Sequence, residues 1–67
     1  MMVIIVADGC TERYVTRFGN DLTKLRVSTA VMDAKKFSSA SGVKAVKALN
    51  ELYMQQGRYP KILAMGL

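Results

Sequence analysis

Hydrophobic residues recur with two different periods along this chain of 67 residues, and these periods predict one helix and several strands. Between residues 38 and 57, apolar side chains recur at helical spacing at Val46, Leu49 and Tyr53. The polar side chains of this stretch fall mainly on the opposite side: Lys44, Lys47, Glu51 and Gln55. Either of its first two serines can cap free backbone amides, and Gly57 can adopt the left-handed conformation that ends a helix. We therefore predict an amphipathic helix with one buried face.

The residues before this helix have the patterns of β-strands. Residues 2–7 are apolar on both faces, which is typical of a strand in the centre of a sheet. Asp8 and Gly9 form a turn signal, and residues 12–18 are rich in the aromatic and β-branched side chains that suit a pleated surface. Residues 24–29 alternate polar and apolar side chains. We therefore expect three strands, the first two joined in a hairpin.

Alternation within the second and third strands decides which side chains face the helix. We expect the helix to cover the face that carries the aromatic and aliphatic side chains: Tyr14, Phe18, Leu25 and Val27. The opposite face would then be open and carry four basic side chains: Arg13, Arg17, Lys24 and Arg26. These four are either a secondary binding face or the ordinary solvated side of a half-covered antiparallel sheet.

The remaining stretches complete the predicted fold. Residues 19–21 form a second turn, and residues 31–37 form a turn of helix with Ala34 and Phe37 facing inward. After Pro60, residues 61–67 return as a last strand, because proline is tolerated where a strand begins. The predicted order is β-β-β-α-β. This is an α+β fold in which a small antiparallel sheet carries one amphipathic helix on one face.

Length and cysteine content indicate how such a chain is stabilised. Residues 1–67 form a single domain, whose core alone rarely supplies more than about 3–5 kcal/mol. Cys10 is the sole cysteine and histidine is absent, so neither an internal disulfide nor a usual zinc site can add stability. We therefore expect a homodimer. The lone thiol favours the cytoplasm, and the apolar start is too short to cross a membrane.

Positive charge is concentrated in the second half of the chain. Residues 1–34 hold four basic and four acidic side chains, whereas residues 35–67 hold six basic and one acidic. The six lie on the predicted helix and its flanks: Lys35, Lys36, Lys44, Lys47, Arg58 and Lys61. A clustered positive field attracts anionic partners, either nucleic acid or an acidic protein surface. The plainer interpretation is a solvated lysine face that keeps a small protein soluble.

Residues that carry catalytic chemistry are scarce in this sequence. The commonest general base, histidine, is absent, and the five carboxylates are scattered without a spacing that predicts a pair. Cys10 has only a nearby arginine or a helix end to lower its pKa, which favours an inert turn thiol. The glycines fit neither a phosphate-binding loop nor a dinucleotide fingerprint. We therefore expect a protein that is not an enzyme and binds no cofactor or metal.

Two classes of partner suit a small basic binding protein. Lysine and arginine neutralise phosphates, and aromatic side chains can stack on unpaired bases. On the predicted faces, however, Tyr14 and Phe18 point away from Arg13 and Arg17, so one nucleic-acid strand could not contact both groups. The competing class is a protein partner, which could add to an exposed edge strand or dock an acidic groove on the lysine-rich helix.

Residues 13–57 resemble the small accessory proteins of bacteriophages and prophages. The resemblance covers the stretch YVTRFG, a turn, then DAKKFSS leading into an alanine-rich helix that ends LNELYMQQG. It implies a non-catalytic module that binds and modulates a host protein or protein complex. Nucleic-acid mimics among such proteins are acidic, and this chain is basic, which disfavours mimicry of DNA. The alternative function is that of a small basic regulatory protein that binds nucleic acid.

Overall fold

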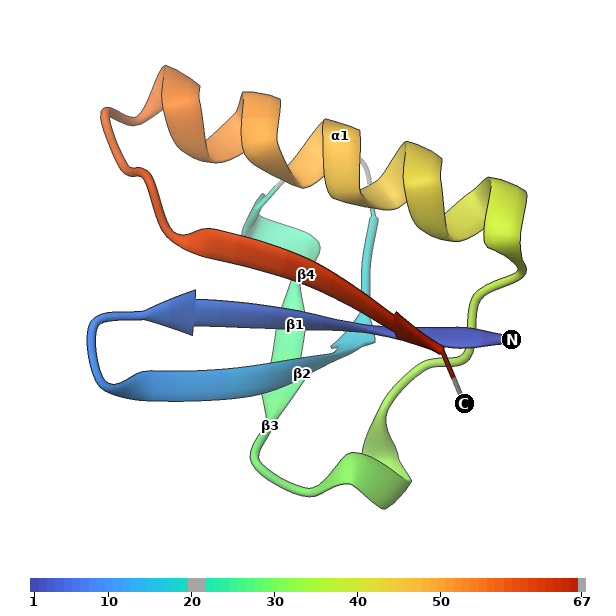
Figure 1. Ribbon diagram of the computed structural model, residues 1–67. Coiled ribbons are helices and arrows are strands. Elements are labelled where there is room, and N and C mark those ends of the chain that lie inside the picture. The colour runs from blue at the N-terminus through green and yellow to red at the C-terminus, as the bar shows by residue number, and fades with distance from the viewer. Residues whose placement is uncertain (20–21, 67) are drawn as a thin grey trace.

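The structure, a computed structural model that describes residues 1–19 and 22–66, is an antiparallel sheet with one α-helix packed on one face (Figure 1). The described strands are β1 (Met2–Asp8), β2 (Thr11–Arg17), β3 (Arg26–Ser28) and β4 (Lys61–Gly66). The described helices are α1 (Ser39–Gln55) and two short 3-10 helices, η1 (Leu22–Lys24) and η2 (Val31–Asp33). The strand order is β3-β2-β1-β4, so β1 is central. The predicted α+β class and the central first strand are confirmed.

Helix α1 begins and ends where its sequence predicts. Ser38 adopts an extended conformation, and its hydroxyl accepts a hydrogen bond of 3.2 Å from the backbone N–H of Ser41. Gly57 has a φ of 70°, a conformation in which a side chain would be strained. The buried face is formed by residues at helical spacing: Gly42, Ala45, Leu49 and Tyr53. The helix therefore holds its position through one apolar stripe pressed against the sheet.

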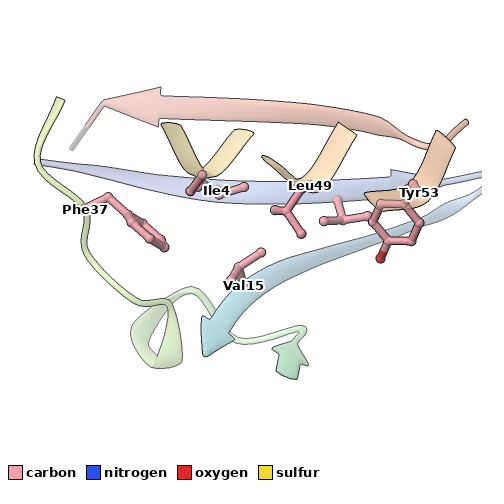
Figure 2. Packing of buried hydrophobic residues seen from close by; sticks show 7 residues of the cluster. Ile4, Val15, Phe37, Leu49 and Tyr53 are labelled. Carbon is pink, nitrogen blue, oxygen red and sulfur yellow. The ribbon is translucent and has the colours of Figure 1, made fainter. Parts of the chain in front are cut away.

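The core lies between α1 and the facing side of β1 and β2 (Figure 2). Ile4, Val15 and Leu49 are fully buried at its centre. Phe37 and Tyr53 are buried towards the two ends of this core. Phe37 comes just before α1 in the chain, and Tyr53 lies near the end of α1. Ala34 is also buried, so the prediction that Ala34 and Phe37 face inward is confirmed. The helical turn predicted over residues 31–37 is limited to Val31–Asp33.

The predicted faces of β2 are reversed in the structure. Val15 is fully buried in the same cluster as Ile4 and Leu49, whereas Tyr14 pairs with Ile5 and is half-buried on the opposite face. The prediction that α1 covers Tyr14 is therefore wrong. The side chain of Val15 can be fully buried without leaving a polar atom unpaired. Tyr14 has a hydroxyl, which stays in contact with water when the side chain lies on the open face. Because successive side chains of a strand alternate between its faces, burying Val15 instead of Tyr14 exchanges the two predicted faces of β2.

The four basic side chains predicted for the open face do not share one face. Arg13 lies two residues before Val15 and lines a hollow on the helix side, beside Val6 and Tyr53. The other three gather around Phe18 instead: Arg17, Lys24 and Arg26. The pairing of β2 with β3 shifts register near the end of β2. That irregularity interrupts the alternation on which the prediction of a single basic face depends.

A short extended segment, residues 35–37, lies beside the start of β1 and contacts β2. The backbone N–H of Met2 donates to the carbonyl of Phe37, and the N–H of Phe37 donates back to Met2, both at 2.8 Å. The N–H of Lys35 donates to the carbonyl of Val15 at 2.9 Å. The pairing between β1 and β2 covers Ile5 to Asp8 and does not include the start of β1. This segment therefore provides backbone partners at the end of the sheet where β1 and β2 are not paired.

The boundaries of the third strand differ most from their prediction. The alternation predicts one strand over residues 24–29, but the chain forms η1 up to Lys24 and pairs with β2 only over Arg26–Ser28. Leu25, between the two, is half-buried against the core. The predicted turn at residues 19–21 and the predicted strand up to residue 67 include Asn20, Asp21 and Leu67, which lie outside the described residues.

At Gly42, helix α1 lies close to the side chain of Met2 at the start of β1. A side chain added at Gly42 would overlap the thioether of Met2 and meet the Cβ atom of Phe37 at 3.6 Å. We expect Gly42→Val to lower the free energy of unfolding by about 1–3 kcal/mol, because a β-branched side chain cannot be accommodated there without shifting the packing. Urea denaturation followed by circular dichroism measures the change. Gly66→Val is the matched control, since a Cβ atom there meets nothing within 4 Å.

Candidate anion-binding surface

Two neighbouring hollows share Phe18 as part of their lining. The first, of about 400 Å³, lies between residues 35–38 and the first half of α1. The second, of about 390 Å³, lies between the end of β2 and the region of η1 and β3. Phe18 itself is half-buried and packs against the core. The two hollows therefore form adjoining parts of one surface, with a single aromatic side chain between them.

Three lysines line the first hollow, and two different elements position them. Lys35 and Lys36 belong to the segment that pairs with β1 and β2, so their backbone is fixed by the hydrogen bonds of that segment. The ammonium group of Lys35 lies 5.2 Å from the centre of the Phe37 ring, a distance suited to a cation–π contact. Lys44 comes from α1, on the flank of the helix that also carries Ala48. The hollow combines these cations with an apolar floor.

Three further cations line the second hollow: Arg17, Lys24 and Arg26. The guanidinium group of Arg26 donates hydrogen bonds to the backbone carbonyls of Thr23 and Leu25, at 3.1 and 3.0 Å. These bonds hold the side chain against the turn that precedes β3. Because backbone carbonyls are neutral acceptors, they leave the positive charge of Arg26 in place. Its charge is therefore held beside that of Arg17.

We call the six cations of the two hollows the basic surface. The described residues that line these hollows include no acidic side chain, and Lys24 has a further interaction of its own. The members of the basic surface are Arg17, Lys24, Arg26, Lys35, Lys36 and Lys44. An ion pair of 2.8 Å between Arg58 and Asp8 lies outside these two hollows. Like charges gathered on one surface produce a strong local positive potential.

The structure brings together members of both groups of basic residues that the sequence predicts as separate sites. Lys35, Lys36 and Lys44 come from the first group, and Arg17, Lys24 and Arg26 come from the second. The other predicted site residues do not line these hollows: Arg13, Lys47, Arg58 and Lys61. Arg13 and Arg58 share a third hollow, where Arg58 pairs with Asp8 and lies 5.1 Å from the centre of the Tyr53 ring.

Phe18 is the residue of this surface that sequence reasoning assigns elsewhere. The alternation predicts it in the core beneath the helix, and it does pack against the core while lining both hollows. The only local signal is its place between Arg17 and Gly19 in the sequence. Lys35 and Lys36 come close to Phe18 because residues 35–37 pair with β1. No periodic pattern in the sequence predicts this pairing.

Other chemistry is sparse over the described residues. Cys10 is a free, exposed thiol in the turn between β1 and β2. Residues 1–19 and 22–66 hold no group of three or more cysteine and acidic side chains arranged to bind a metal ion. Within the same ranges, no helix combines the length and hydrophobicity that crossing a membrane requires. The basic surface is therefore the strongest candidate site in the described structure.

The chain matches no protein-family model, and no curated protein or solved structure is significantly similar to it. The resemblance to phage accessory proteins and the expected cytoplasmic location therefore stay predictions.

Proposed function

We propose that this protein is a non-catalytic module that binds the phosphate backbone of nucleic acid through the basic surface. The observation that carries the proposal is the gathering of six cations, from four separate segments, around Phe18. Phosphate contacts supply most of the affinity of sequence-independent nucleic-acid binding, because each neutralised phosphate releases a condensed counterion.

In the structure, an aromatic side chain and basic side chains lie on the same surface, contrary to the faces predicted from the sequence. On those faces an aromatic side chain and the arginines of β2 point in opposite directions, so one strand of nucleic acid could not contact both. In the structure, Phe18 lines the same hollow as Arg17 and the same hollow as Lys44. A chain of phosphates can therefore follow the cations while passing over an exposed part of an aromatic ring, as in other proteins that bind single strands.

The first test is the salt dependence of binding to a labelled single-stranded oligonucleotide, followed by fluorescence anisotropy. With the five cations other than Lys24 engaged, since Lys24 has an interaction of its own, the logarithm of the association constant should fall with the logarithm of salt concentration with a slope of about −3.5, at about −0.7 per neutralised phosphate. A labelled neutral polymer of similar length is the control and should not bind. A lack of oligonucleotide binding at low salt would overturn the proposal.

An acidic protein partner is the second candidate, and one specific observation favours it. The floor of the first hollow is apolar, formed by Phe18, Ala45 and Ala48 between the lysines. Such a hollow suits an apolar side chain flanked by carboxylates on a partner, in keeping with the host protein or complex predicted from the resemblance to phage accessory proteins. Affinity capture from bacterial lysate with and without nuclease separates the two candidates. A protein retained after nuclease treatment supports the second, and disappearance of the whole eluate supports the first.

A further inference from the structure

Strand β4 forms one edge of the sheet and is long and almost uncharged. Its only sheet partner among the described strands is β1, so the backbone groups on its outer side have no strand to pair with in that part of the chain. Lys61 is the single charged residue of the six in this strand. Soluble proteins usually protect such an edge with charges, a proline, a bulge or a short strand, because it otherwise pairs with another chain.

The opposite edge of the sheet has the protection that β4 lacks. Strand β3 is only three residues long and begins with Arg26, and its pairing with β2 contains a register shift. The short helices η1 and η2 lie before and after it in the chain. An added strand would find only a short, charged stretch to pair with there. The contrast identifies β4 as the edge that is available for association.

Exposed apolar side chains also gather around β4. The described residues include nine large hydrophobic side chains that are exposed. Five of them lie on β4, just before it, or on one flank of α1: Val43, Met54, Tyr59, Leu63 and Met65. Because the flank with Lys44 and Ala48 lines the hollow towards Phe18, the opposite flank with Val43 and Met54 lies towards β4. Figure 1 shows β4 running alongside α1.

On the face of the sheet away from α1, the exposed side chains of Leu63 and Met65 lie beside Val3 and Ile5 of β1, which are themselves buried. Leu63 pairs with Ile5 and Met65 pairs with Val3, so their side chains share that face. Ile5 also pairs with Tyr14 of β2, which makes a row of apolar side chains across three strands. An edge strand flanked by apolar side chains on both faces can bury area on both sides of an added strand.

We propose that two copies of this chain associate through β4, antiparallel and related by a two-fold axis, and so join their sheets into one. The single charge on β4, at Lys61, permits a second copy at this edge and favours the antiparallel direction. In an antiparallel pair centred on Leu63 or Ala64, the two Lys61 side chains lie at opposite ends of the new ladder. With a rise of about 3.3 Å per residue they are roughly 13 Å or more apart, so their repulsion is screened at physiological salt. A parallel pair in register would place them side by side.

The same symmetry brings the apolar flanks together. A two-fold axis perpendicular to the sheet leaves the α1 helices of both copies on the same face, with the flanks that carry Val43 and Met54 turned towards each other. Leu63 and Met65 of each copy meet on the other face. The proposal is independent of nucleic-acid binding, because the basic surface lies on the far flank of α1 and stays open in this dimer.

The test introduces a positive or a negative charge at Leu63 by substitution. Sedimentation velocity over a wide range of protein concentration then measures whether each variant is a monomer or a dimer. The unmodified chain is expected to reach twice its 7.4 kDa mass as concentration rises. Leu63→Lys and Leu63→Glu should each remain monomeric, because the axis brings the two altered side chains close together, either opposite or diagonal. An equimolar mixture of the two variants should recover the dimer. Met32→Lys, at a side chain that is 88% exposed on η2, is the control and should dimerise normally.

Circular dichroism of each variant checks that it is folded, since Leu63 is 42% exposed and its replacement should leave the core intact. A chain that stays monomeric at all concentrations would overturn the proposal. So would a dimer that both Leu63 variants still form separately, because that dimer would use another surface. Because oligonucleotide binding is measured on the same samples, a failed dimer and a failed basic surface are distinguishable.

Discussion

Leu49→Ala should leave a large fraction of the chain unfolded at room temperature in dilute solution. Leu49 is fully buried at the centre of the cluster that joins α1 to β1 and β2. Replacing a buried leucine by alanine costs about 2–5 kcal/mol, because it removes apolar packing and leaves a cavity. A domain of this size has only about 3–5 kcal/mol to lose. The single change is therefore comparable with the whole stability of the fold.

Urea denaturation at low protein concentration, followed by far-ultraviolet circular dichroism, measures the decrease in stability. Met32→Ala is the control, because Met32 is exposed on η2 and its truncation should change the free energy of unfolding by less than about 0.5 kcal/mol. A midpoint for Leu49→Ala equal to that of the unmodified chain would mean that the packing of α1 on the sheet does not stabilise the fold. High protein concentration is avoided because dimerisation would add stability.

The double variant Lys36→Glu/Lys44→Glu should weaken oligonucleotide binding by at least about tenfold, because each charge-assisted interaction with a phosphate contributes on the order of 1 kcal/mol. The two side chains come from different segments and line the same hollow. The slope of binding against salt should also become shallower by about 1.4, since two fewer phosphates are neutralised. Fluorescence anisotropy at several salt concentrations gives both quantities.

Lys47→Glu/Lys61→Glu is the matched control for this variant. It makes the same change in net charge at two exposed lysines that do not line either hollow of the basic surface. Lys47 lies on the same helix as Lys44, only three residues away, so the comparison separates position from charge. Equal decreases of affinity in the two double variants would show that binding depends on total charge alone, and the basic surface would lose its assigned role.

The sequence predicts the fold well where one pattern dominates a long stretch. The stripe of Leu49 and Tyr53, the serine cap and Gly57 define α1 to within about two residues, because helical spacing and end signals act locally. The continuous apolar run of β1 likewise places it in the centre of the sheet. In these elements, local propensity and the final packing favour the same structure.

Prediction fails where the outcome depends on packing between distant segments. The two faces of β2 differ by one residue of register, and the packing of Val15 against Ile4 and Leu49 decides between them. The basic surface depends on residues 35–37 pairing with β1, which brings Lys36 to the end of β2. Composition indicates that cations are abundant in the second half of the chain, but only the tertiary arrangement shows which of them meet.

The position of β4 beside β1 has a consequence for how the chain folds. Met2 pairs with Gly66, so the central strand has only one of its two neighbours until the last described strand has been made. Because β1 is made first and β4 is the last described strand, one edge of the apolar strand β1 has no partner strand until β4 is available. Pairing between such distant parts of the chain raises the contact order and slows folding relative to helical proteins of equal length. The complete sheet therefore depends on pairing between the first and the last described strands of the chain.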